Sequence, residues 1–228
     1  MRHALVSYPD VALGVECAFP PPEGALRHRA GRVRRLARAG LGFLVAALLV
    51  AGLWQVGNGA YIHAKAELAQ ILLAHAWKRT LAGERHARPW PWADTWPVAR
   101  LSVPSRRVEL FVLAGANERT IAFGPGHVFG TPLPGETGNS AIGGHRDTHL
   151  AFLRDVALGD EILVERPDRR LQRYRVDWLQ VLDKRETWVL KNEGPTRLTL
   201  ITCYPFDAIR AGGAERYVVS ARAQDGLL

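Results

Sequence analysis

The hydrophobic pattern divides the chain into one long apolar stretch and a series of short apolar runs separated by turns. Residues 39–62 carry no charged side chain over 24 positions. A helix needs about 20 mostly apolar residues to cross a membrane, so this stretch is long enough. Residues 64–81 follow with apolar positions at near-helical spacing, which predicts an amphipathic helix.

Beyond residue 97 the apolar runs are short and rich in β-branched residues. They are separated by turn-forming clusters such as FGPGH, PLPGETGN and NEGPT, which is typical of an all-β barrel or sandwich. No G-x-G-x-x-G motif opens a helix, which disfavours a nucleotide-binding α/β domain. Brief helical turns are predicted at 116–122 and 150–156. The predicted strands are 98–103, 106–113, 139–144, 160–165, 171–182, 197–202 and 216–221.

The segment 88–101, RPWPWADTWPVARL, cannot be helical because three of its residues are prolines. We interpret it as a structural collar that docks the entering chain onto the barrel. A platform of tryptophan and proline for a peptide or sugar is the alternative. The predicted organisation is a basic tail, a membrane anchor, a helical and Trp/Pro-rich connector and a β-barrel, at residues 1–38, 39–62, 63–97 and 98–228.

Charge is distributed unevenly along a chain whose composition is otherwise globular, with 47% hydrophobic and 23% charged residues. The first 38 residues hold seven arginines and three acidic residues, a net +4 that is half of the total of +8. This placement argues against a nucleic-acid partner. By the positive-inside rule it predicts a cytoplasmic N terminus and a periplasmic barrel at a bacterial inner membrane. A cleaved signal peptide is disfavoured because no sharp A-x-A site follows the apolar stretch.

The chain contains two cysteines, Cys17 and Cys203, which this topology puts on opposite sides of the membrane. They cannot form a disulfide within one chain. Cys203 is then a single thiol in a compartment that oxidises thiols, so it needs either burial or a chemical role. An ordinary buried cysteine is the alternative.

Three stretches place chemically active residues at predicted strand ends: His145 in GGHRD, Cys203 in TLITC and Arg216 in ERYVV. A cysteine thiolate attacks an amide carbonyl, a fixed arginine stabilises the oxyanion, and a histidinium protonates the departing amine. These residues predict an acyl-transfer site. Arg210 competes for the role of anion stabiliser, but we favour Arg216 because strands position side chains more precisely than loops.

His145, Asp147 and His149 form H-x-D-x-H, which can be read as a set of metal ligands. A zinc site wants at least three firm ligands and usually a distant one, so this interpretation is disfavoured. Asp147 is better interpreted as a local hydrogen-bond partner. His127 and His149 are interpreted as structural.

The three stretches together resemble the sortases, which are extracytoplasmic cysteine transpeptidases. TLITC matches their TLxTC motif, Gly144-His145 matches their catalytic histidine, and Arg216 matches the arginine of the strand after the cysteine. The order of these residues is also the same. A narrower similarity, to the Gram-negative sortases called class GN, lies in the segments PWPWADTWPVARL, FGPGH, HRDTHLAFLRD and TCYPFDAI. The resemblance runs from about residue 88 to the end.

This resemblance implies an eight-stranded sortase-type β-barrel with short helices and no metal or organic cofactor. It implies a protein substrate with a C-terminal LPxTG-like sorting signal, cleaved between Thr and Gly while Cys203 holds the acyl group. The implied substrate-binding residues are Thr199, Thr202, Tyr204 and Pro205. No residue identifies the amine acceptor or the oligomeric state.

Two other functions fit the same residues. One is a non-catalytic extracytoplasmic module that binds peptides, and the other is a cysteine peptidase that mainly hydrolyses them. An L,D-transpeptidase is disfavoured because the S-x-G-C context typical of its cysteine is missing.

Overall fold

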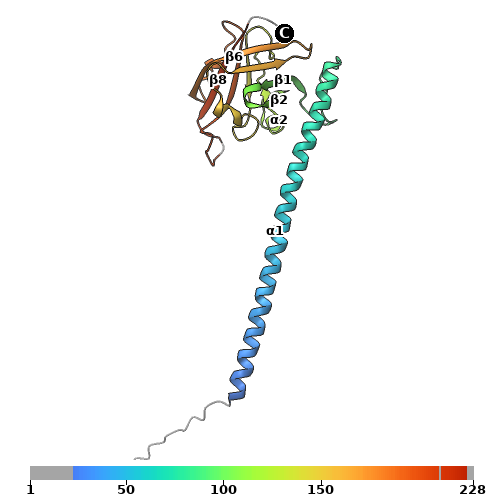
Figure 1. The fold of residues 1–228 in the computed structure, drawn as a ribbon, viewed down its shortest axis with the longest axis vertical. Helices are drawn as coiled ribbons and strands as arrows, with labels where there is room; N and C mark the ends of the chain where they lie inside the picture. Colours follow the sequence, from blue (N-terminus) through green and yellow to red (C-terminus); the bar gives the residue numbers. More distant parts are fainter. Residues whose placement is uncertain (1–22, 211, 225–228) are drawn as a thin grey trace, which may run out of the picture. The chain divides into compact units, whose positions relative to one another are not determined.

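The computed structural model describes residues 23–210 and 212–224, and Figure 1 shows its helix and barrel. The chain divides between Ala60 and Tyr61 into two compact units. The first contains most of the helix α1, and the second contains the end of that helix and the barrel. Residues 1–22 of the predicted basic tail lie outside the described residues.

Helix α1 runs without a break over Glu23–Leu81. The sequence predicted two helices here, a span at 39–62 and an amphipathic helix at 64–81. Gly57 and Gly59 do not separate them, because a glycine inside a helix costs only about 1 kcal/mol while its neighbours continue the hydrogen-bond ladder. Among the described residues, α1 is the one helix long and apolar enough to cross a membrane, and none of its apolar window is buried.

The last turns of α1 pack onto the barrel through one face. Ala69, Leu73, Ala76 and Trp77 are each at most 5% exposed, and their spacing places them on the same side of the helix. The side chain of Gln70 donates a hydrogen bond to the Phe123 carbonyl at 2.9 Å. The C-terminal part of α1 is therefore a component of the second unit.

Eight strands close into a barrel in the order β1-β2-β3-β4-β7-β8-β6-β5, which confirms the predicted fold class. The pairs β2–β3 and β4–β7 are parallel, and the other six are antiparallel. The strands are β1 Pro97–Val103, β2 Val108–Ala114, β3 Gly126–His127, β4 Asn139–Gly143, β5 Glu161–Glu165, β6 Leu171–Asp183, β7 Arg197–Tyr204 and β8 Glu215–Ala223.

Alternation along β7 determines which of its side chains enter the barrel. Leu198 and Leu200 are fully buried in the core, where they pack with Val219 of β8. Burying each leucine contributes about 1.5–3 kcal/mol, and a slip of one residue would exchange the inner and outer faces of the strand. The core thus holds Cys203 on the outer face.

Strand β3 was not predicted, because FGPGH was interpreted as a turn. It is two residues long and pairs with β2 on one side and β4 on the other. A Cβ at Gly126 would lie 2.1 Å from the Gly115 carbonyl oxygen, so only glycine fits this close approach of two backbones. The barrel closes through a segment that carries almost no hydrophobic pattern.

Short helices occur where brief helical turns were predicted. Helix α2 covers Glu118–Ile121 and begins at Asn117, whose side chain accepts a hydrogen bond from the Thr120 amide at 3.0 Å. The 3₁₀ helix η2 covers Ala151–Asp155. Two further 3₁₀ turns are η1 at Pro104–Arg106 and η3 at Thr187–Leu190.

The connector before β1 docks onto the barrel through two of its three tryptophans. Trp90 meets Phe123 edge-on with ring centroids 5.0 Å apart, and Trp96 packs against the hydrophobic core of the barrel. Trp92 is 82% exposed. These contacts are those of a collar rather than of a continuous aromatic platform.

Candidate active site

Strands β7 and β8 place Cys203 directly opposite Arg216 in their antiparallel register. Side chains of directly opposed residues lie on the same face of a sheet, with Cβ atoms about 4.5–5.5 Å apart. Both side chains are partly exposed. The thiol and the guanidinium therefore belong to one outward-facing surface.

His145 follows β4 on the other side of β7, at the same end of the sheet as Cys203. Strand β4 runs parallel to β7 with Gly143 opposite Ile201, and the Gly144 amide donates to the Ile201 carbonyl at 3.2 Å. His145 lies two residues beyond Gly143, as Cys203 lies two residues beyond Ile201. The three predicted catalytic residues are thus brought to adjacent ends of β4, β7 and β8.

Thr202 is buried and supports the backbone that precedes His145. It is 2% exposed, and its Oγ1 donates to the Gly144 carbonyl at 2.8 Å. A Cβ at Gly144 would lie 2.9 Å from Cγ of Leu150, so the backbone before His145 passes through a tight space. Thr202 ties β7 to that backbone and does not face solvent.

Aromatic side chains pack beneath the loop that leaves β7. Tyr204 stacks on Tyr217 with centroids 6.2 Å apart, and Phe206 meets Tyr217 edge-on at 5.3 Å. Partial burial raises the pKa of Tyr217, and nearby Tyr204 raises it further. Pro205 lies exposed between the two aromatic residues of the loop.

The two candidate arginines differ in their surroundings. Nη1 of Arg216 donates to the carbonyls of Gly213 and Glu215, each at 2.8 Å. These bonds hold the guanidinium beside the end of the β7–β8 loop. The side chain of Arg210 is exposed on that loop.

A pocket of about 600 Å³ opens on the same sheet farther from the strand ends. Thr199 of β7 lies in it and donates from Oγ1 to Oδ1 of Asn139 at 2.7 Å. Thr199 is four residues before Cys203, or about 13 Å along a strand. The pocket is lined by Asn139, Asp177, Trp178, Trp188, Val189, Lys191, Glu193, Arg197, Thr199 and Ser220.

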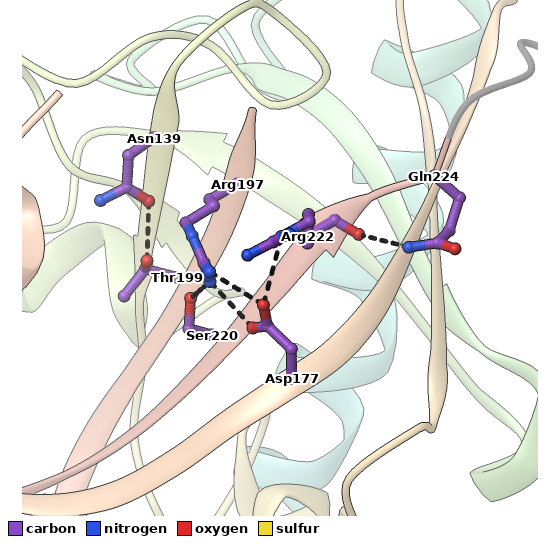
Figure 2. Close-up of polar contacts among 7 residues, drawn as sticks. All are labelled: Asn139, Asp177, Arg197, Thr199, Ser220, Arg222 and Gln224. Carbon is purple, nitrogen blue, oxygen red and sulfur yellow. Dashed lines mark hydrogen bonds and ion pairs between the residues drawn. The ribbon is translucent and has the colours of Figure 1, made fainter. Parts of the chain in front are cut away.

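Figure 2 shows a polar cluster from strands β6, β7 and β8. Three of its residues, Asp177, Arg197 and Ser220, line this pocket. Arg197 makes two 2.8 Å bonds to the carboxylate of Asp177 and a 2.7 Å bond to Ser220 Oγ. Nε of Arg222 lies 3.5 Å from the same carboxylate. Trp178 and Trp188 meet edge-on at 5.7 Å and supply the apolar part of the lining.

Sequence reasoning did not nominate this cluster. Asp177, Arg197 and Ser220 are far apart in the sequence and meet because β6, β8 and β7 are neighbours in the barrel. The available signal was a charged residue among the apolar positions of strand β6 and another at the start of β7. These positions alone do not indicate which charged residue pairs with which.

Histidines outside the strand ends have other surroundings. His127 is 4% exposed, and its Nε2 lies 2.9 Å from the Pro132 carbonyl and 3.1 Å from Thr131 Oγ1. Burial lowers the pKa of His149; a hydrogen bond with the Ala122 backbone opposes this shift, and nearby His145 adds to it.

Within residues 23–210 and 212–224, no three His, Cys, Asp or Glu side chains are grouped to hold a metal ion.

His149 is expected to make the stability of the barrel depend on pH. Its pKa is lowered in the folded state, so the unfolded state binds more protons below the ordinary value of 6.5. Stability is therefore lost as pH falls through that value and is regained as pH rises. Replacing His149 with glutamine should flatten the dependence of Tm on pH between about pH 5 and 7.

Thermal unfolding of the full chain across this range measures the effect. The matched variant His75→Gln changes an exposed histidine of α1 and should keep the wild-type slope. A His149→Gln slope equal to that of the wild type would contradict the effect of burial on this imidazole.

Comparisons with known proteins agree on one family. The family model described as the sortase domain matches residues 101–224. Sortase D of Bacillus subtilis (strain 168) is 26% identical over 120 residues, which are 52% of this chain and 60% of that protein. The chain thus spans less than two thirds of this curated relative.

Solved structures give the same result. Sortase C-1 from Actinomyces oris is 31% identical, with a TM-score of 0.50 over 57% of this chain and 75% of that chain. Sortase A from Listeria monocytogenes is 26% identical, with a TM-score of 0.51 over 58% of this chain and 90% of that chain.

Proposed function

Because this chain belongs to the sortase family, whose domain model matches residues 101–224, we propose that it is a membrane-anchored cysteine transpeptidase acting on an LPxTG-like sorting signal. The observation that carries this proposal is the shared register of β4, β7 and β8. It supports a site in which His145, Cys203 and Arg216 act on one substrate carbonyl.

In the proposed reaction the Cys203 thiolate adds to the carbonyl carbon of the signal's threonine, and a carbon–sulfur bond forms. The oxygen takes the negative charge, which the guanidinium of Arg216 stabilises. His145 then gives a proton to the nitrogen of the departing glycine as the carbon–nitrogen bond breaks. An amine attacks the thioester and gives a proton to the now neutral His145, and the Cys203 thiolate leaves as the carbon–sulfur bond breaks and the new amide forms.

The pocket around Thr199 is proposed to receive substrate residues some distance from the bond that is cut. An extended peptide advances about 3.3 Å per residue, so the 13 Å between Thr199 and Cys203 corresponds to about four residues. Trp178 and Trp188 offer apolar contact at that distance. In this proposal Thr202 supports the backbone from within the barrel, and Tyr204 and Pro205 line the opposite side of the site.

We also propose that residues 39–62 anchor the chain in the inner membrane, with a cytoplasmic N terminus and a periplasmic barrel. The apolar window of α1 and the arginines that precede it in the sequence support this orientation. The motifs around the Trp/Pro segment and Cys203 support membership of class GN. No resident metal or cofactor takes part in the proposed reaction.

Trapping of the thioacyl enzyme tests the proposed function. The full chain in detergent is mixed with a panel of LPxTG-like peptides and measured by intact-protein mass spectrometry. We expect a mass increase equal to the peptide fragment ending in threonine, located on Cys203. Hydroxylamine and the productive amine acceptors should remove it and appear in the released product.

The rival functions predict different results. A non-catalytic binding module retains peptide without any covalent adduct, even though iodoacetamide alkylates Cys203. A peptidase that mainly hydrolyses forms the adduct but releases only the free acid, whichever amine is added.

A further inference from the structure

Arg146, the residue after His145, is buried, and no carboxylate among the described residues pairs with it. Its side chain is 7% exposed, although arginine is almost never buried unless it is paired. The ion pairs of the described residues do not include it. Nη1 of Arg146 is buried and makes no hydrogen bond within the described part of the chain.

The other end of the guanidinium is bound to the β7–β8 loop. Nη2 of Arg146 donates to the carbonyls of Ala208 and Arg210 at 2.7 and 2.8 Å. Bonds from a charged donor are shorter and stronger than neutral ones, and here a single nitrogen of the planar guanidinium binds both carbonyls. A buried cation without a counter-charge is costly, so an uncharged side chain would serve mere packing better.

The backbone on the other side of His145 is bound to β7. The Gly144 amide donates to the Ile201 carbonyl, and the Gly144 carbonyl accepts from Oγ1 of Thr202. The carbonyl of His145 itself accepts from the Leu150 amide at 3.0 Å. His145 is therefore held between two attachments, one to the strand before Cys203 and one to the loop after it.

From this arrangement we propose that Arg146 is a positioning residue, which holds His145 and the β7–β8 loop in one fixed relation across Cys203. The expected effect on kcat rests on the proposed function. The attachment of the loop to the segment that carries His145 rests on the hydrogen bonds alone. Arg216 binds the far end of the same loop at Gly213. Ile209 lies in the loop between the attached carbonyls of Ala208 and Arg210, and it is fully exposed. Its side chain therefore does not help to hold the loop by packing.

Replacing Arg146 with methionine keeps an apolar stem and removes both loop bonds. We expect the amides of residues 206–210 to exchange with deuterium about tenfold faster or more, because each lost bond to a charged donor stabilised the closed loop. The kcat for acyl transfer should fall by about tenfold or more while KM changes little, since a small displacement of a catalytic group is costly.

Arg146→Lys provides the conservative comparison. Lysine keeps the charge but carries it on a flexible stem, without the planar guanidinium that directs Nη2 at both carbonyls, so exchange and kcat should lie between those of the wild type and Arg146→Met. Arg166→Met is the matched control, because Nη1 of Arg166 donates to the Gly135 carbonyl at 2.9 Å in a different loop. It should leave residues 206–210 and kcat as in the wild type.

Hydrogen exchange and turnover distinguish a failure of the proposed function from a failure of the inference about Arg146. A wild-type chain that forms no thioacyl adduct overturns the proposed function, while faster exchange in Arg146→Met still supports the attachment. Wild-type exchange at 206–210 in Arg146→Met overturns the inference, as does a loss of kcat no larger than in Arg166→Met. If Arg146→Met does not fold, Arg146→Lys decides, and wild-type exchange in that variant overturns the inference.

Discussion

Replacing Cys203 with alanine is expected to abolish acyl transfer by this chain. The thioester cannot form without the sulfur, so kcat/KM should fall by roughly 10⁴-fold or more and no peptide adduct should appear. Cys203 lies on the outer face of β7 and is partly exposed, so the change should alter the free energy of unfolding by less than about 1 kcal/mol. Intact mass and product formation measure the loss, and thermal unfolding measures the stability.

Cys17→Ala is the matched control, because it removes the other thiol of the chain. It should form the adduct at the wild-type rate. Turnover that survives in Cys203→Ala means that another group is the nucleophile. Peptide binding that is equal in the wild type and Cys203→Ala, with turnover in neither, identifies a binding module.

Replacing Arg216 with methionine is expected to lower kcat by about 10²–10³-fold, the usual cost of losing one oxyanion donor. Arg216 lies opposite Cys203 across β7 and β8, whereas the side chain of Arg210 is exposed on the loop. Arg210→Met should therefore change kcat by less than about tenfold. Single-turnover formation of the thioacyl enzyme is the appropriate measurement, since it isolates the step in which the oxyanion develops.

Loss of the bond from Arg216 to Gly213 must be separated from loss of the oxyanion donor. Arg216→Lys keeps the charge without the fork, and it should retain more activity than Arg216→Met. Hydrogen exchange of the loop in both variants shows how far the loop has opened. A larger loss in Arg210→Met than in Arg216→Met reverses the assignment and makes Arg210 the anion stabiliser.

Local pattern predicted the strands that carry a hydrophobic face. Strand β7 begins at Arg197, as predicted, and ends at Tyr204, two residues beyond the predicted end, and Leu198 and Leu200 enter the core. Strand β3 was missed because its two residues have no alternation, and they pair only when β2 and β4 are already beside them. The unbroken α1 was missed because an uncharged stretch and an amphipathic stretch were treated as two helices, whereas the backbone hydrogen bonds of one helix continue through both.

Motifs nominated His145, Cys203 and Arg216, but no local pattern indicated the residues that surround them. Arg146 reads as an exposed basic residue after a histidine, yet it is buried against two carbonyls more than 60 residues away in the sequence. The resemblance implied that Thr202 binds substrate, and the structure adds that it is buried and donates to the Gly144 carbonyl.

The sequence by itself determined the apolar helix and the all-β character of the rest, and it nominated three candidate reactive side chains. These depend on the order of residue types within a few neighbouring positions. Only the tertiary structure decided that β4 lies parallel beside β7, that Asp177 meets Arg197, and that a buried guanidinium joins the histidine segment to the loop after the cysteine. Such contacts arise from the closure of the barrel, in which the pairing of distant strands and the space left between them select the partners.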